Sequence, residues 1–168
     1  MRYDPGPETV VPAPSHTAVR EALSPLADAE LARWTRASDS YVLLEDPGVT
    51  LPGCRVWVLS PVGATTPVGI RLVEADSALT ATSQLPDAIA ALLADHPPAD
   101  ANLPGVFFHL WTDPGRPVEP IAGTEIVRRE GDTLVVGIDT HDRWRGRMRW
   151  AAQVRSRRAH VTMTEIPG

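Results

Sequence analysis

The 168-residue chain contains 43% hydrophobic and 22% charged residues, which is typical of a soluble globular domain with a sizeable core. Its apolar runs are too short to span a bilayer, and MRYDPGPETVVPAP at the start lacks the apolar segment of a secretory signal, so we expect a cytoplasmic protein. The single Cys54 excludes an internal disulfide, and no paired cysteines or closely spaced histidines indicate a metal site.

The net charge of −5 is unevenly distributed. Residues 128–168 hold nine arginines and five acids, which gives +4, whereas residues 1–127 hold seven arginines and sixteen acids, which gives −9. An arginine-rich sheet suits a carboxylate or phosphate partner, because guanidinium groups bind both with two hydrogen bonds. The acidic chain as a whole and the lack of an aromatic–basic stacking motif argue against nucleic acid.

The first part of the chain predicts an arm followed by helix. Residues 1–16 carry four of the seventeen prolines and predict an extended arm, so we expect a single domain over residues 17–168. Residues 17–23 predict a short helical turn. Ser24 and Pro25 then predict the start of a helix that ends near Ala37.

The remainder predicts short strands and a second helix. Alternating or apolar runs between turn residues predict strands at 41–45, 54–60, 68–74, 78–82, 106–111, 124–129 and 133–139. Residues 86–95 predict the second helix, which Pro97 and Pro98 end. Runs of antiparallel hairpins with two helices predict an α+β fold, an antiparallel β-sheet with a few helices packed on one side.

Residues 143–165 carry the most regular pattern in the chain, RWRGRMRWAAQVRSRRAHVTMTE. Arginines occupy every second position from 143 to 149, with Trp144, Gly146, Met148 and Trp150 between them. This period of two predicts a strand with one cationic and one apolar face. RSRR at 155–158 predicts a turn, and residues 159–166 predict the partner strand.

A symmetric turn fixes the register of this hairpin. It pairs Trp150 with Met163, Ala152 with Val161, and Met148 with Glu165. The first two pairs set apolar beside apolar, as a half-buried sheet requires. The third sets the Glu165 carboxylate on the apolar face, where a poorly solvated acid would suit a general acid or base. The more common alternative is a glutamate at a strand end that faces water.

Other candidate residues also leave two interpretations open. The arginine face is either a cradle for an anion or a solvated surface with cross-strand acids such as Asp139. Arg71 is either a carboxylate clamp in a cavity or, by strand alternation, an outward residue. His109 is either a ligand or base, or a core histidine, and the DTHD segment at 139–142 is either an acid–base pair or turn chemistry. Cys54 has no evident base beside it.

Four segments in order resemble the chorismate pyruvate-lyase family. They are RWTRASDSYVLLEDPG at 33–48, IRLVEADSALTATSQL at 70–85, NLPG at 102–105, and RWRGRMRW with the final RRAHVTMTEIPG at 143–168. The chain departs from the family in a longer segment after the second helix and in the Ile-Pro-Gly that follows Glu165.

The resemblance implies a sheet that encloses a small ligand cavity and a lyase acting on a cyclic or aromatic carboxylic acid, without a cofactor or metal. In chorismate chemistry pyruvate is eliminated and 4-hydroxybenzoate remains. Arg71 would anchor the substrate carboxylate and Glu165 would be the acid/base. The predicted binding residues are Tyr41, Leu103, Gly105, Met148 and Trp150. The alternatives are a non-catalytic ligand-binding or accessory protein on the same scaffold, and an anion- or nucleic-acid-binding module. The sequence carries no signal for an oligomeric state.

Overall fold

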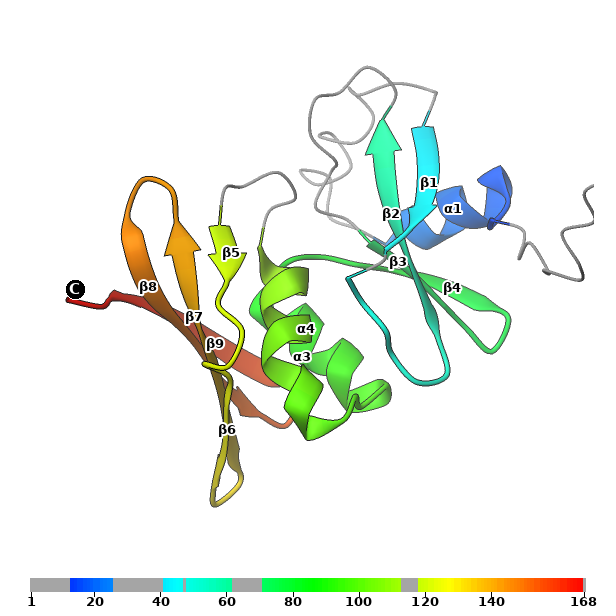
Figure 1. Ribbon diagram of the computed structural model, residues 1–168. Coiled ribbons are helices and arrows are strands. Elements are labelled where there is room, and N and C mark those ends of the chain that lie inside the picture. The colour runs from blue at the N-terminus through cyan, green and yellow to red at the C-terminus, as the bar shows by residue number, and fades with distance from the viewer. Residues whose placement is uncertain (1–12, 26–40, 47, 62–70, 113–117, 168) are drawn as a thin grey trace, which may run out of the picture.

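The computed structural model describes residues 13–25, 41–46, 48–61, 71–112 and 118–167 (Figure 1). These ranges contain the helices α1 (His16–Leu23), α3 (Pro86–Asp95) and α4 (Leu103–Trp111), with a short 3-10 turn at Asp100–Asn102. The strands form two antiparallel sheets, so the predicted α+β class is confirmed, with two sheets in place of one. The helix predicted after Ser24 and most of the proline-rich arm lie outside the described residues.

The first sheet has four strands in sequence order. These are β1 (Tyr41–Glu45), β2 (Arg55–Pro61), β3 (Arg71–Ala75) and β4 (Ala78–Thr82). The predicted bounds of β1, β4 and α3 are confirmed. Asp76 and Ser77 make the tight β3–β4 turn with φ of 51° and 64°, a left-handed conformation that short polar side chains tolerate.

The second sheet is built around β7 (Thr133–Asp142), which pairs with β8 (Gly146–Arg155) on one side. On its other side β7 pairs with β5 (Val118–Pro120) near its end and with β6 (Ile126–Glu130) near its start. β8 then pairs with β9 (Arg158–Glu165). The predicted register is confirmed at Trp150–Met163, Ala152–Val161 and Met148–Glu165. Strand β5 was not predicted from the sequence.

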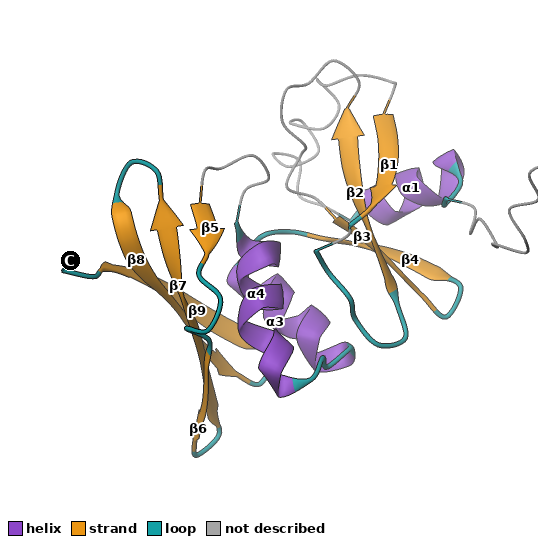
Figure 2. Cartoon of the chain, viewed as in Figure 1, coloured by secondary structure: helices purple, strands orange, loops and turns teal. Residues whose placement is uncertain are grey.

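The two sheets lie on either side of α3 and α4 (Figure 2). α1 covers the other face of the first sheet, where Val19 and Leu23 pack with Leu59 and Leu72. The main core joins residues of both sheets with the two helices, and Trp150, fully buried, packs against Phe107 and Phe108 with ring centroids 5.3 and 5.7 Å apart. The first sheet is therefore covered on both faces.

Residues 106–111, predicted as a strand, are helical in α4. Leu103 and Pro104 open this helix, because proline fits its first turn, where no backbone donor is needed. Six of its nine residues are buried between the sheets, and a segment with so many apolar positions shows no clear amphipathic period that would distinguish a helix from a buried strand.

Candidate functional site

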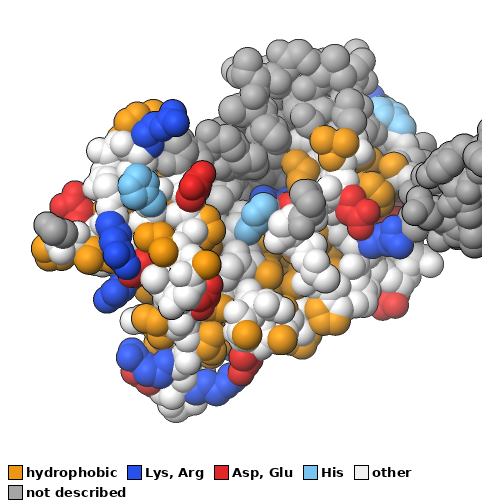
Figure 3. All heavy atoms as spheres, viewed as in Figure 1, with side chains coloured by type: hydrophobic (Ala, Val, Ile, Leu, Met, Phe, Trp, Pro, Cys, Tyr) orange, Lys and Arg blue, Asp and Glu red, His pale blue; other side chains and the backbone are white. Residues whose placement is uncertain are grey.

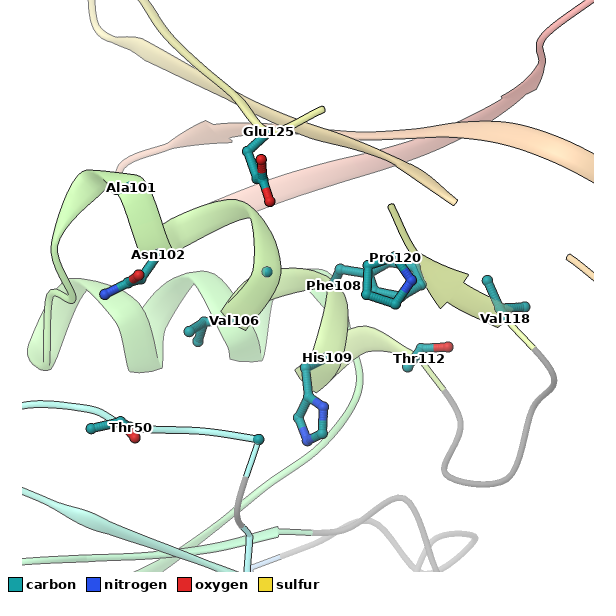
Figure 4. Close-up of a pocket in the computed structure, with 12 residues that line it drawn as sticks. Thr50, Ala101, Asn102, Val106, Phe108, His109, Thr112, Val118, Pro120 and Glu125 are labelled. Atoms are coloured by element: carbon teal, nitrogen blue, oxygen red, sulfur yellow. The ribbon is translucent and has the colours of Figure 1, made fainter. Parts of the chain in front are cut away.

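An open cleft of about 560 Å³ lies beside α4 and reaches to β5 and to the segment after β1. Its lining includes Gly48, Asn102, Gly105, His109, Thr112 and Glu125. The imidazole of His109 projects from α4 toward the segment that carries Thr50 (Figure 4). The His109 side chain is 38% exposed, which leaves it accessible from the cleft.

Asp46 and Arg71 form a buried ion pair behind this histidine. Nε of Arg71 donates to Oδ2 of Asp46 at 2.9 Å, and the two side chains are only 5% and 3% exposed. The other guanidinium nitrogens donate to the backbone oxygens of Leu110 at 3.1 Å and His109 at 3.3 Å. Arg71 therefore satisfies carbonyl groups at the C-terminal end of α4, where a cation is favoured.

The second oxygen of Asp46 holds His109. Oδ1 lies 2.8 Å from Nε2 of His109 and also accepts the N–H of Gly48 at 3.0 Å. Burial by itself raises the pKa of Asp46, but the hydrogen bonds and charges of His109 and Arg71 outweigh it and lower the pKa to about 2. The carboxylate is thus ionised at neutral pH and can only accept, so Nε2 of His109 carries a proton.

Gly48 permits this arrangement because it has no side chain. A Cβ atom at this position would lie 2.6 Å from Nδ1 of His109, inside van der Waals contact. The D-P-G segment at 46–48 directly follows β1, and two of its residues shape the site, since Asp46 orients the ring and Gly48 leaves room for it.

Arg71 and Glu165, the two predicted catalytic residues, do not share a site. The expectation of an outward Arg71 is wrong, because β3 is covered on both faces and Arg71 is 4% exposed. Glu165 is exposed at the end of β9, so of its two interpretations the structure supports the glutamate at a strand end that faces water, and not the carboxylate in apolar surroundings. α3 contacts the start of β9, where Asp87 accepts the N–H of Ala159. The C-terminal end of β9, which carries Glu165, lies far from β3 (Figure 1).

The predicted binding residues are dispersed. Gly105 lines the cleft, whereas Leu103 lines a separate cavity on the opposite face of α4. Met148 and Trp150 are buried in the protein interior at 4% and 0% exposure. The backbone of Tyr41 pairs with Pro61 in the first sheet, and its side chain lies outside the described part of the structure.

The arginine face is a solvated surface with a cross-strand acid, as one of the two interpretations predicts. Arg147 and Arg149 both donate to the carboxylate of Asp139, at 3.1 and 3.0 Å. The hydrogen bond from Arg149 lowers the pKa of Asp139. Arginine and acidic side chains lie next to each other on the surface over the second sheet (Figure 3). Asp142 shapes the following turn by accepting the N–H groups of Trp144 and Arg145.

Comparisons of the chain with models of protein families, with curated proteins and with solved structures find no match. Among the described residues, no group of three or more His, Cys, Asp or Glu side chains is placed to hold a metal ion. No helix in the described ranges has the length and apolar character needed to cross a membrane.

Proposed function

We propose that this protein binds a small polar molecule in the cleft beside His109 and that His109 exchanges a proton with it. The observation that carries the proposal is the buried, ionised Asp46 carboxylate 2.8 Å from Nε2 of a histidine that is open to the cleft. A carboxylate that fixes the tautomer and orientation of an imidazole is a recurrent feature of general acid–base sites.

The protonation of its two ring nitrogens decides whether His109 acts as an acid or as a base. Because Nε2 keeps its proton toward Asp46, exchange with a ligand takes place at Nδ1. The neutral ring accepts a hydrogen bond there and acts as a base, whereas the cationic ring donates one and acts as an acid. The Asp46 carboxylate is already paired with Arg71, so the cluster of Asp46, Arg71 and His109 carries no net charge when the His109 ring is neutral.

Other polar groups in the cleft provide specificity. Oγ1 of Thr112 is buried without a hydrogen-bond partner in the described part of the chain, although Thr112 lines the cleft. A buried hydroxyl without a hydrogen-bond partner costs about 1–3 kcal/mol, and rotation of the Thr112 side chain toward a polar group of a ligand in the cleft would recover this energy. Asn102 adds an amide at the start of α4.

For the substrate we propose a cyclic or aromatic carboxylic acid, and for the reaction a lyase-type elimination such as the release of pyruvate from chorismate. Two lining residues of the cleft, Asn102 and Gly105, belong to the NLPG segment through which the resemblance implies ligand contact. In this proposal His109 moves the proton during elimination, because Glu165 lies outside the cleft lining.

The test is to incubate the protein with chorismate and other small cyclic acids while following products by chromatography and ligand binding by NMR. We expect saturable binding that shifts the His109 ring resonances and is lost in His109→Gln. His141→Gln is the matched control, because His141 is an exposed histidine on β7 outside the cleft lining. Binding without turnover would favour the accessory-protein alternative, and binding that leaves the His109 resonances unchanged would refute the site.

A further inference from the structure

A second cavity, of about 270 Å³, lies on the face of α4 opposite the His109 cleft. It is bounded by the C-terminal half of α3, the start of α4 and the inner face of the second sheet. Its lining shares no residue with that of the cleft, so the two are separate sites.

The walls of this cavity are hydrocarbon. Leu93, Leu103, Phe107 and Val136 are 7%, 8%, 1% and 0% exposed, and Leu134 and Val154 complete the wall. An apolar cavity of about 150 Å³ is enough to bind benzene in a protein interior, so this one has room for a larger apolar body. Burial of such a body gains about 25 cal/mol for each Å² removed from water.

The polar lining residues that carry charge are Arg129, Asp100 and Asp132. Asp132 is paired with Arg155 at 2.9 Å. Arg129 is held more loosely, because only Nη2 contacts Asp100, at 3.3 Å, and both side chains are mostly exposed. By contrast, the nearby Arg157 binds Asp95 through two nitrogens at 2.6 and 3.1 Å.

An exposed ion pair with one long hydrogen bond contributes little free energy, typically less than about 1 kcal/mol. Arg129 can therefore exchange Asp100 for a ligand carboxylate that accepts two hydrogen bonds, while Asp100 turns to water. The hydrocarbon of such a ligand would pack against the apolar wall at Phe107, and its carboxylate would bind Arg129.

We propose that this cavity binds a monocarboxylic acid with a compact hydrocarbon body, of the medium-chain or branched class, and that Arg129 recognises its carboxylate. The neighbouring Arg128 provides an internal comparison. It lies one residue earlier on β6, is similarly exposed, and pairs with Glu130 at 2.7 Å, but it does not line the cavity.

Titration calorimetry of the full chain with octanoate, 1-octanol and octylamine tests the proposal. We expect saturable binding of octanoate at one site and at least tenfold weaker binding of the alcohol and the amine. Arg129→Gln should weaken octanoate binding about tenfold, whereas Arg128→Gln should change it less than twofold. His109→Gln should leave it unchanged, which separates this site from the proposed cleft function.

A second variant tests the cavity itself. Ala94 lines it from the exposed side of α3, so Ala94→Leu should fill part of the volume and weaken octanoate binding while the thermal transition is retained. The proposal is overturned if octanoate does not bind saturably, if octylamine or octanol binds as tightly, if both arginine variants weaken binding equally, or if folded Ala94→Leu binds octanoate like the parent chain.

Discussion

Nε of Arg71 lies 2.9 Å from Oδ2 of Asp46 in an ion pair that is almost fully buried. It connects β3 to the end of β1, and through the backbone oxygens of His109 and Leu110 it reaches α4. The pair thus connects the first sheet to the helix that carries the candidate base.

Removing the anion of this pair should destabilise the protein strongly. Asp46→Asn leaves the Arg71 guanidinium buried without a counter-charge, and we expect a loss of about 3–5 kcal/mol in the free energy of unfolding, measured by urea titration. Glu130→Gln breaks the exposed pair with Arg128 and should cost less than about 1 kcal/mol. Equal losses in the two variants would contradict the structural role of the buried pair.

The same carboxylate should make stability depend on acid pH. The pKa of Asp46 is lowered from 3.8 to about 2 in the folded protein, so the folded state binds fewer protons than the unfolded state between these values. Its contribution is complete above pH 3.8 and is lost as the pH falls through about 2, by about 2 kcal/mol in total.

Urea titrations at several pH values between 2 and 5 measure this contribution. Asp46→Asn provides the control, because asparagine does not titrate. The difference in stability between the parent chain and the variant should shrink as the pH falls. A difference that stays constant over this range would mean that Asp46 is not held in its ionised form.

Alanine substitutions at two glycines of the cleft should change the stability of the protein in opposite directions. Gly48→Ala places a Cβ against the His109 ring, so we expect displacement of the ring, loss of ligand binding and a cost of about 1–3 kcal/mol. Gly105→Ala meets no atom within 4 Å and should stabilise α4 by up to about 1 kcal/mol. Thermal melting measures both effects, and the NMR shifts of His109 report the ring position.

Gly105→Ala also tests the ligand contact that the resemblance implies. If the substrate approaches the backbone of Gly105, the added methyl group should weaken binding without loss of stability. Full binding in Gly105→Ala together with reduced binding in Gly48→Ala would assign recognition to the His109 side of the cleft.

Alanine substitutions of Trp144 and Trp150 should change the free energy of unfolding by very different amounts. Trp150 is fully buried among Phe107, Phe108 and Trp111, so Trp150→Ala should cost about 3–5 kcal/mol of unfolding free energy. Trp144 is 79% exposed, and Trp144→Ala should change stability by less than about 0.5 kcal/mol. A large loss in Trp144→Ala would show that this turn packs against another part of the protein.

Local patterns predicted most strands of this fold because each depends on neighbouring residues alone. The turn at Ser156 and Arg157 closes the β8–β9 hairpin, and with alternating side chains it fixed the register that sets Met148 opposite Glu165. α4 was missed because apolar residues occupy most of its positions, so that no clear period distinguishes a buried helix from a buried strand.

The candidate site was only partly predictable. His109 was considered, but Asp46 lies 63 residues away and was not singled out. No local sequence pattern predicts that the two residues are in contact, because the contact forms only where the residue after β1 packs against α4. For Glu165 the register was predicted, and of the two environments considered the structure has the exposed one.

The sequence by itself determined the class of the fold, the pairing of β8 with β9 and the alternation of their side chains. Only the tertiary structure decided which faces are covered. The helices between the two sheets bury Arg71, leave Glu165 exposed and bring His109 onto Asp46. The physical reason is that backbone periodicity is a local property, whereas burial and charge pairing depend on which elements pack together.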